Sequence, residues 1–197
     1  MKKYYGKSPL NEITRNQIIR RSKQESPDRF AKIKNYFRQK DFENVNFVKL
    51  FEDDEFVWTS TIGDYDVTIS FEGAFQNLYN FVRSWGGKDR WKRINIQLLS
   101  KCLTKSLDTE DLYVDCTCPD FRYRFAFWLT QADAKYGKPE NRRPTVRNVK
   151  NNKGFVCKHI LSVLYGKRWV PAAAKVWLEY IRANPELAEE YIWGYNR

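Results

Sequence analysis

Histidine and cysteine are scarce in this chain of 197 residues, which has one histidine and four cysteines. A Ser-His-Asp or Cys-His-Asp triad needs a histidine, so any such triad would have to use the single one at position 159. No glycine-rich phosphate loop ending in Lys-Ser or Lys-Thr is present. The sequence therefore lacks the motifs of the common nucleophilic hydrolases and phosphate-loop nucleotide-binding proteins.

Long apolar runs are missing as well. None approaches the ~18 residues of a membrane-spanning helix. The basic start, residues 1–7, is not followed by the apolar stretch of a secretory signal. We therefore expect no membrane segment and no export by a signal peptide. A reducing cytosol is then the default compartment, and it favours metal-bound thiolates over disulfides.

The composition is that of a globular protein with an uneven charge distribution. Apolar residues make up 42% of the chain and charged residues 30%. The net charge is +11, with +9 in residues 1–40, −7 in residues 41–87 and +6 in residues 119–156. A basic amino-terminal region and a second basic segment thus flank an acidic middle, which indicates anionic partners or solvated charged faces.

Three cysteines and the histidine form two tight pairs, Cys116-Thr-Cys118 and Cys157-Lys-His159, with 38 residues between them. Three sulfurs and one imidazole are a donor set for a closed tetrahedral zinc site, so we predict one structural Zn²⁺ bound by these four residues. A disulfide between Cys116 and Cys118 has poor geometry at this spacing. A Cys116–Cys157 disulfide remains open for an oxidising compartment. Cys102 falls outside the pattern, and we expect it to be a small core residue.

The residues around the two pairs predict the local structure. Alternating apolar residues over 112–114 indicate a strand that ends at the first pair, and Pro119 stops it. Asp120 can cap the helix that follows. Apolar residues of that helix are spaced for one face, and they are Phe121, Phe125, Trp128 and Leu129. The second pair opens another helix, which we expect Gly166 to end. Because neither pair encloses a metal alone, folding and metal binding should be coupled.

The order C-x-C…C-x-H, with Cys-Pro-Asp-Phe on one side and Cys-Lys-His-Ile-Leu on the other, resembles the SWIM zinc finger, a ββα metal module. The resemblance covers about residues 110–166. It implies that Cys116, Cys118, Cys157 and His159 are zinc ligands, and that the module binds DNA or protein and performs no chemistry. The gap between the pairs is longer than in most SWIM fingers. The string Cys-Pro-Asp-Phe-Arg-Tyr-Arg-Phe-Ala, followed by Tyr-Gly-Lys-Pro-Glu-Asn-Arg-Arg-Pro and Cys-Lys-His, looks like a long-gap variant found in structural proteins of tailed bacteriophages, including crAss-like phages.

Two basic regions are candidates for partner binding. The amino-terminal region predicts helices at about 9–23 and 27–40, each opened by Ser-Pro, and the first carries Arg20 and Arg21 on its polar face. The polar insertion 134–154 has loop character and a length that is usually functional or disordered. Its candidates for contact with phosphates or an acidic protein are Lys138, Arg142, Arg143, Arg147, Lys150 and Lys153. Solvated helix faces are the alternative interpretation.

The acidic middle predicts a small sheet and two helices. Residues 44–71 alternate as a three-stranded antiparallel meander, with a turn at Gly63-Asp64. Residues 74–84 have helical spacing, and residues 89–104 fit a helix or a strand, of which we choose the helix. The acids at 52–55 lack the spacing of a calcium loop and are interpreted as a solvated turn.

The carboxyl-terminal tail predicts two more helices, at about 171–183 and 185–193, each opened by proline. Its last residues are rich in aromatic side chains, which either pack on the same domain or form an interaction site. Both alternatives stay open at this point.

These patterns predict an α+β protein, a small antiparallel sheet with several helices stapled by one structural zinc site. Residues 1–42 would form a basic helical arm and residues 43–109 an α+β region. Residues 110–166 would form the zinc module with its basic insertion, and residues 167–197 a helical tail.

We expect a non-catalytic protein, because a metal with four protein ligands leaves no open position and uses the only histidine. The resemblance favours an assembly component of a tailed-phage virion, in the head or neck. It would contact DNA or neighbouring subunits, as a homo-oligomer or ring, in the virion or in host cytoplasm before assembly. No membrane and no small-molecule substrate are expected. A cytosolic SWIM-type nucleic-acid-binding regulatory or processing factor is the alternative. A third is an enzyme using Asp64, Asp66 and Glu72, although their spacing indicates no catalytic site.

Overall fold

A computed structural model describes residues 13–33, 55–87, 89–144 and 156–193. In chain order the elements are α1 (Arg15–Glu25), α2 (Pro27–Lys32), β1 (Phe56–Ile62), β2 (Tyr65–Phe71), α3 (Ala74–Val82), the 3₁₀ turn η2 (Arg90–Arg93), α4 (Ile96–Thr109), β3 (Leu112–Cys116), the π-helical segment η3 (Phe121–Phe125), α5 (Ala126–Gln131), α6 (Lys158–Gly166), α7 (Val170–Ala183) and α8 (Pro185–Trp193). The predicted α+β class is confirmed. No helix among the described residues has the length and apolar character needed to cross a membrane.

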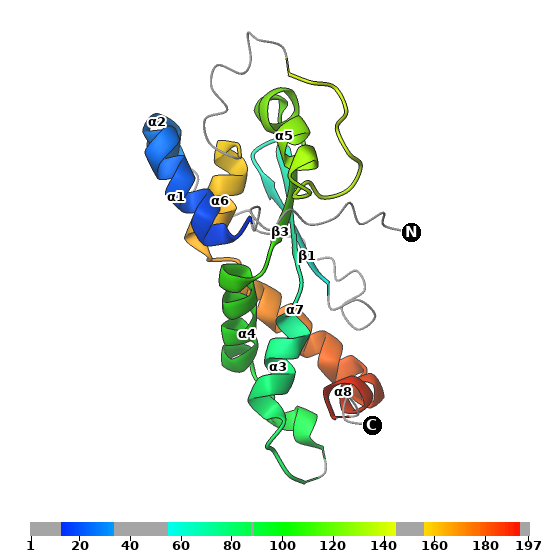
Figure 1. The fold of residues 1–197 in the computed structure, drawn as a ribbon. Helices are drawn as coiled ribbons and strands as arrows, with labels where there is room; N and C mark the ends of the chain where they lie inside the picture. Colours follow the sequence, from blue (N-terminus) through cyan, green and yellow to red (C-terminus); the bar gives the residue numbers. More distant parts are fainter. Residues whose placement is uncertain (1–12, 34–54, 88, 145–155, 194–197) are drawn as a thin grey trace.

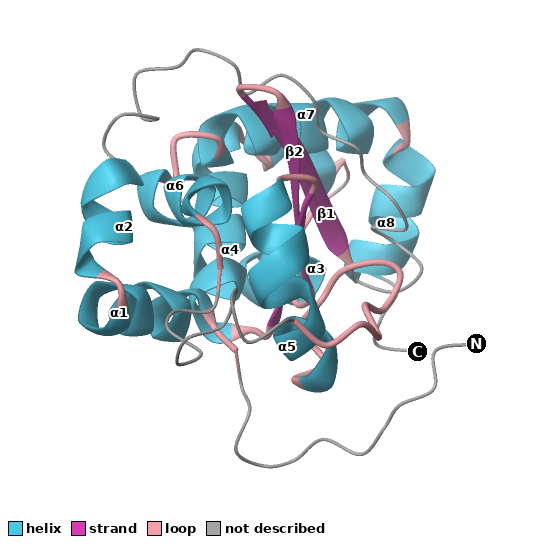
Figure 2. Cartoon of the chain, turned by 90° about the horizontal axis from the view of Figure 1, so that it is seen from above, coloured by secondary structure: helices cyan, strands magenta, loops and turns pink. Residues whose placement is uncertain are grey.

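Helices lie around both ends of one three-stranded antiparallel sheet with the order β1-β2-β3 (Figure 1). α1, α2, α5 and α6 gather at one end of the molecule, and α3, α4, α7 and α8 gather at the other. The view along the perpendicular direction shows the strands enclosed by helices (Figure 2). The sheet therefore connects the half that contains the two Cys/His pairs with a helical half.

Strand pairing joins distant parts of the sequence. β1 and β2 form a hairpin in which Ile62 faces Tyr65 across a two-residue turn. Gly63 has φ 61° in this turn, a conformation that glycine adopts without steric cost. β3 then pairs with β2, so that Cys116 faces Val67. The third strand of this sheet is thus β3, while the strand predicted near 47–51 lies outside the described residues.

Aromatic rings fill the core beside the sheet. The Trp58 and Trp169 rings stack with centroids 4.8 Å apart, and the Phe56 and Phe71 rings lie 5.0 Å apart. Trp177 of α7 is fully buried and lies 6.4 Å from Phe56. The high aromatic content is therefore used to bury large rings between β1, β2 and the segment that starts α7.

The amino-terminal helices differ from the prediction in their bounds. α1 begins at Arg15, because Thr14 is extended and its Oγ1 accepts the Gln17 N–H at 3.4 Å. The start predicted for the helix over 9–23 is therefore wrong, and its Ser-Pro opening lies outside the described residues. α2 begins at Pro27 as predicted, and the part of the predicted helix beyond residue 33 lies outside the described residues.

α4 confirms the helix chosen for residues 89–104 but not its limits. It starts at Ile96, because the Asn95 side chain accepts the Leu98 N–H at 3.0 Å, and it runs to Thr109. The residues before it form η2 and an extended connection. Cys102 is fully buried in α4, so its assignment as a core residue is confirmed. The helices predicted at 74–84, 171–183 and 185–193 correspond to α3, α7 and α8.

A carboxylate on α4 links three helical segments. Asp108 accepts from Arg15 Nη1 at 2.8 Å and from Lys167 Nζ at 2.7 Å. Arg15 Nε also donates to the Leu164 carbonyl at 2.6 Å, near the end of α6. The three charged side chains are only 12–29% exposed, so solvent screens this cluster less than it screens a surface ion pair. The cluster therefore fixes α1 and the end of α6 against α4.

Replacing Asp108 with asparagine should lower the free energy of unfolding by about 1–2 kcal/mol, because two partly buried cations lose their partner. Glu179→Gln is the matched control, since it breaks an exposed Lys175–Glu179 contact of 4.0 Å on α7. That control should cost less than about 0.5 kcal/mol. Urea unfolding curves measure both changes. Equal losses of unfolding free energy in the two variants would contradict the role of Asp108 in fixing α1 and the end of α6 against α4.

Candidate metal centre

The side chains of Cys116, Cys118, Cys157 and His159 converge on one point. Their donor atoms all lie within 4.8 Å of one another, and all four side chains are buried. Cys116 Sγ lies 3.9 Å from His159 Nδ1. Donors around a tetrahedral zinc are about 3.6–3.8 Å apart, because Zn–S is about 2.3 Å and Zn–N about 2.0–2.1 Å. The group could therefore hold one metal ion after small adjustments of its side chains.

The strand β3 places the first pair. Successive side chains alternate across a strand, and Leu112, Val114 and Cys116 occupy its buried face. Cys118 comes two residues later, and Thr117 between the cysteines is anchored to β2. The Thr117 N–H donates to the Asp66 carbonyl at 3.0 Å, and the Asp66 N–H donates to Thr117 Oγ1 at 2.9 Å. This reciprocal pair of hydrogen bonds fixes the turn that presents both sulfurs.

Cys118 itself opens the next helix. The Phe121 N–H donates to Cys118 Sγ at 3.3 Å, and the Arg122 N–H donates to the Cys118 carbonyl at 3.1 Å. The predicted cap at Asp120 is therefore wrong, since its side chain makes no capping hydrogen bond and instead pairs with Arg124 at 3.1 Å. The sulfur accepts a backbone hydrogen bond and offers a ligand position at once.

The apolar face predicted for this helix is confirmed at its main positions. Phe121, Phe125 and Leu129 are buried, whereas Trp128 is half-buried. The first turns form the π-helical segment η3, whose backbone hydrogen bonds span five residues where those of an α-helix span four. Such segments frequently occur near functional sites.

The second pair is positioned by the start of α6, as predicted. Cys157 is the cap residue, and its carbonyl accepts the Leu161 N–H at 3.1 Å. His159 lies in the first turn, with its ring centroid 5.0 Å from that of Tyr65. The helix includes Gly166 at its end, but the left-handed residue that terminates it is Lys167, with φ 46°.

The three sulfurs hydrogen-bond with one another. Hydrogen bonds with the side chains of Cys116 and Cys157 hold the pKa of Cys118 well below its ordinary value. The hydrogen bond with Cys118 raises the pKa of Cys116 to about 12, and burial raises the pKa of Cys157. A divalent cation bound by these sulfurs would displace the thiol protons. A donor set of three sulfurs and one imidazole suits zinc, and a metal held by all four would have no open position.

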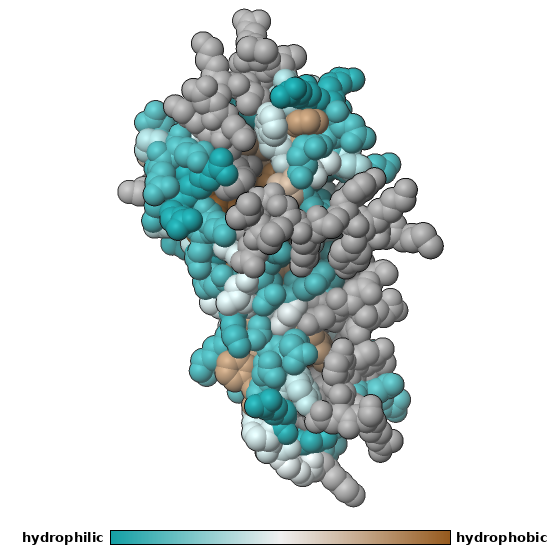
Figure 3. All heavy atoms as spheres, viewed as in Figure 1, coloured by the Kyte–Doolittle hydropathy of each residue, from teal (hydrophilic) through white to brown (hydrophobic). Residues whose placement is uncertain are grey.

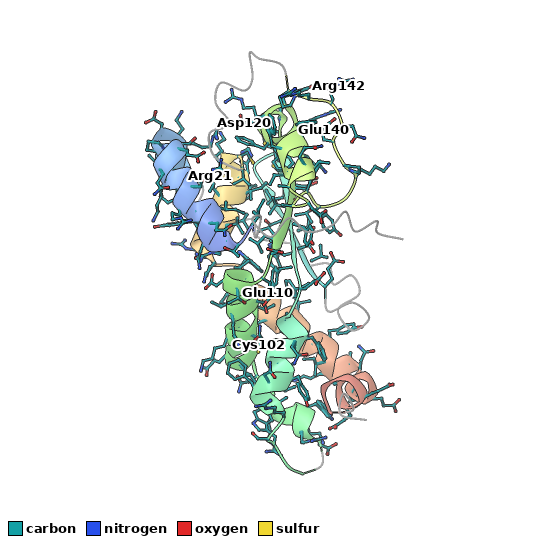
Figure 4. All side chains as sticks on the ribbon, in the orientation of Figure 1. Arg21, Cys102, Glu110, Asp120, Glu140 and Arg142 are labelled. Carbon is teal, nitrogen blue, oxygen red and sulfur yellow. The ribbon has the colours of Figure 1, made fainter. Side chains whose placement is uncertain are left out.

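The basic candidates are distributed over two places. Arg20 is exposed on α1, and Arg21 pairs with Glu25 on the same helix. Lys138, Arg142 and Arg143 are exposed on the loop beside α5, where Figure 4 labels Arg142 near Glu140. The remaining candidates, Arg147, Lys150 and Lys153, lie outside the described residues.

The loop after α5 begins beside β3. Lys135 forms a parallel bridge with Val114, and its Nζ lies 3.0 Å from Asp115 Oδ1. Residues 134–144 thus have the predicted loop character, with one isolated bridge to β3 at Lys135. Further along, the Glu140 N–H donates to Thr130 Oγ1 at 2.9 Å, and the Arg143 guanidinium lies 5.8 Å from the Trp128 ring centroid. These contacts hold the basic loop against α5.

Sequence reasoning missed one exposed group beside the metal centre. Arg122, Tyr123 and Arg124 are all exposed on η3, and Tyr123 is 52% exposed. The Arg122 guanidinium lies 5.9 Å from the Tyr123 ring centroid. The alternation Arg-Tyr-Arg is visible in the sequence, but the π-helical geometry that accompanies it is not. The site thus has an exposed aromatic ring between two cations directly after its second ligand.

The acids Asp64, Asp66 and Glu72 do not form a comparable centre. Asp66 Oδ1 accepts from Thr61 Oγ1 at 2.9 Å. Within the parts of the chain that the structure describes, the Cys₃His group is the one cluster of three or more such side chains that could hold a metal.

Thiol reactivity should separate Cys102 from the other cysteines. Burial raises the pKa of Cys102 to about 12, so only about one in 10,000 of these thiols is ionised at pH 8. In the folded zinc-loaded protein we expect no rapid alkylation at pH 8. After chelation the three thiols of the site should react before Cys102, because metal loss should loosen the structure around them while Cys102 stays in the core stripe of α4. Mass spectrometry counts the modified cysteines. Rapid labelling of Cys102 in the folded protein would contradict its buried position.

Comparisons of the chain with protein-family models, with curated proteins and with solved structures gave no match.

Proposed function

We propose that this chain is a non-catalytic assembly protein whose fold is stapled by one structural zinc ion. The observation that carries the proposal is the convergence of four buried protein donors, three sulfurs and one imidazole, on one point. A catalytic zinc keeps a position for water or substrate, whereas this donor set fills all four. The metal would then connect β3 to α6 and stabilise the surface around them.

The SWIM-like assignment of residues 110–166 rests on the C-x-C and C-x-H motifs. Their order, with a strand before the first pair and a helix after the second, is compatible with a ββα zinc module. The assignment to a tailed-phage virion, in the head or neck, rests on the longer sequence strings that surround these motifs. In this role the chain contacts neighbouring subunits or DNA and forms a homo-oligomer.

Exposed cations near the metal centre support an anionic partner. Arg122, Arg124, Lys138, Arg142 and Arg143 are exposed on η3 and on the loop beside α5. In Figure 3 the coloured atoms at this end of the molecule are mostly hydrophilic. Cations of this kind contact phosphates or carboxylates, so both DNA and an acidic subunit surface fit them.

The test combines metal content, mass and DNA binding of the zinc-loaded full chain. We expect one zinc per chain by elemental analysis and a defined oligomer by light scattering. Binding to duplex DNA is measured across a salt series, where each phosphate contact adds a slope of about −0.9. Arg142→Ala combined with Arg143→Ala should weaken anion binding, while Lys105→Ala combined with Lys175→Ala removes two exposed charges elsewhere as a control.

Each outcome assigns a role. A zinc-loaded oligomer supports the assembly protein. A zinc-loaded monomer with steep salt-dependent DNA affinity would replace it with the cytosolic SWIM-type factor. Absence of zinc from protein purified without chelator would overturn the proposal that the chain binds a structural zinc ion.

A further inference from the structure

The connection between α3 and α4 forms a second basic and aromatic surface. We call residues 83–93 the 83–93 tip. Its sequence contains five cations and one acid, and two of the chain's seven tryptophans. The tip lies at the end of the molecule opposite α5 and the metal centre (Figure 1). The proposed function uses none of its residues.

Two cation–indole contacts organise the 83–93 tip. The Arg93 guanidinium lies 5.5 Å from the Trp85 ring centroid, and Lys92 Nζ lies 5.5 Å from the Trp91 ring centroid. Both indoles are half-buried and pack against the hydrophobic core, whereas Lys92 and Arg93 are exposed. Such contacts contribute roughly 0.5–1 kcal/mol each at exposed sites.

Glycine makes room for one of these cations. Arg93 Nη2 donates to the Gly86 carbonyl, and Gly87 adopts φ 97° beside it. A Cβ on Gly87 would lie 3.3 Å from Arg93 Nη2 and would strain the backbone. The position of the Arg93 guanidinium over Trp85 is therefore a feature of the local fold and not one rotamer of a free side chain.

Part of the positive charge of the 83–93 tip has no carboxylate partner. Arg90 pairs with Glu189 of α8 at 3.4 Å, and Lys92 pairs with Asp89 at 2.9 Å. Arg83 and Arg93 are exposed, and neither has an acidic partner among the described residues. Two exposed guanidinium groups thus remain available for an anion.

We propose that the 83–93 tip binds single-stranded nucleic acid. A single strand alternates phosphates with unpaired planar bases, and proteins bind it with cations and stacking platforms. Arg83 and Arg93 would contact phosphates, and the bases would stack on the guanidinium–indole layer at Trp85 and beside Trp91. Guanidinium groups suit both tasks, because their planes stack and their edges donate to phosphate oxygens.

Other partners use fewer of these features. A DNA duplex offers phosphates but no unstacked base, so the indoles would add nothing. A membrane surface needs apolar side chains that project beyond the charges, whereas here the indoles lie beneath the cations. An acidic peptide would need the charges alone. The proposal does not depend on the proposed function, because the tip lies away from the metal centre.

The experiment uses zinc-loaded full chain and a fluorescent oligothymidylate of about 20 nucleotides. Anisotropy gives the affinity across a salt series. Arg83→Ala combined with Arg93→Ala should weaken binding about 10- to 30-fold near 0.1 M salt and reduce the salt slope by about 1.4, since two phosphate contacts are lost. Lys105→Ala combined with Lys175→Ala is the charge-matched control and should bind like the wild type.

A second variant protects the test against misfolding. Within the described parts of the chain the Arg83 side chain makes no ion pair or hydrogen bond that holds the tip together, so Arg83→Ala should leave the fold intact and reduce the slope by about 0.7. Near-ultraviolet circular dichroism reports whether the tryptophans keep their environment in each variant. Unchanged affinity and slope in a folded Arg83→Ala/Arg93→Ala protein would overturn the proposal.

Two further probes decide the partner class. A duplex of the same length that binds as tightly, with the same sensitivity to the Arg83 and Arg93 substitutions, would overturn the assignment to single strands. Tip-dependent binding to vesicles containing phosphatidylserine, without tip-dependent oligonucleotide binding, would replace it with a membrane surface. If Arg142→Ala/Arg143→Ala lost binding while Arg83→Ala/Arg93→Ala kept it, the nucleic acid would contact the metal-centre end. That result would overturn the proposal for the 83–93 tip and leave the proposed function standing.

Discussion

Cys157→Ser should release the zinc and unfold the half of the molecule around β3, α5 and α6. Cys157 is fully buried and lies at the cap of α6, so its loss removes one ligand and leaves a hydroxyl beside two sulfurs. Structural zinc sites contribute roughly 10–16 kcal/mol of apparent binding free energy in small metal-dependent folds, and that energy is coupled to folding. We therefore expect less than one tenth of the wild-type zinc content and loss of the cooperative melting transition for this region.

Cys102→Ala is the matched control, because Cys102 is also a fully buried cysteine but belongs to the core stripe of α4. It should keep one zinc per chain and cost about 1 kcal/mol, as expected for a small buried side chain. Elemental analysis and thermal melting of both variants decide the assignment. Full zinc content with native melting in Cys157→Ser would show that this cysteine is not a ligand.

Trp169→Ala should be the most destabilising change away from the metal. Its ring stacks on Trp58 at 4.8 Å and lies 6.5 Å from Phe56, and its Nε1 donates to the Val163 carbonyl at 3.1 Å. One side chain thus connects β1, α6 and the start of α7. Truncating a buried tryptophan to alanine costs roughly 3–5 kcal/mol, because apolar contact is lost and a cavity remains.

Trp169→Phe separates the contribution of ring packing from that of the hydrogen bond to Val163, since it keeps an aromatic ring and removes the hydrogen bond. We expect a loss of about 1–2 kcal/mol for it. Tyr123→Ala, which removes an exposed ring on η3, should change stability by less than about 0.5 kcal/mol. Urea unfolding measures all three variants. Equal losses for Trp169→Ala and Tyr123→Ala would contradict the central place of Trp169 in the core.

The two proposed binding surfaces, at opposite ends of the molecule, should differ in how far they depend on zinc. The metal-centre end offers exposed cations on η3 and the loop beside α5, and we expect its shape to depend on the proposed zinc ligands. The 83–93 tip is held by cation–indole contacts and a glycine turn, so zinc removal should affect its binding less. Measuring oligonucleotide and duplex binding before and after chelation therefore distinguishes the two surfaces in one protein.

Local patterns were sufficient for much of the candidate site. The position of Cys116 follows from a strand that ends there, and the position of His159 follows from a helix that is capped by Cys157. These relations act over a few residues, where backbone geometry and side-chain type determine the result. The helices α3, α4, α7 and α8 were predictable for the same reason, although the start of α4 depended on the cap at Asn95.

The sequence by itself determined the donor set, the α+β class and the types of most elements, because apolar periodicity, caps and ligand chemistry are encoded in short segments. The tertiary structure decided that β3 completes the sheet beside β2, that Asp108 meets both Arg15 and Lys167, and that Cys118 rather than Asp120 caps its helix. It also placed the cations of the 83–93 tip over their indoles. Most of these partners lie far apart in the chain, and the others meet only because burial of apolar side chains sets the course of the backbone. Many groups in the sequence could form such contacts, and the sequence pattern does not indicate which of them will meet.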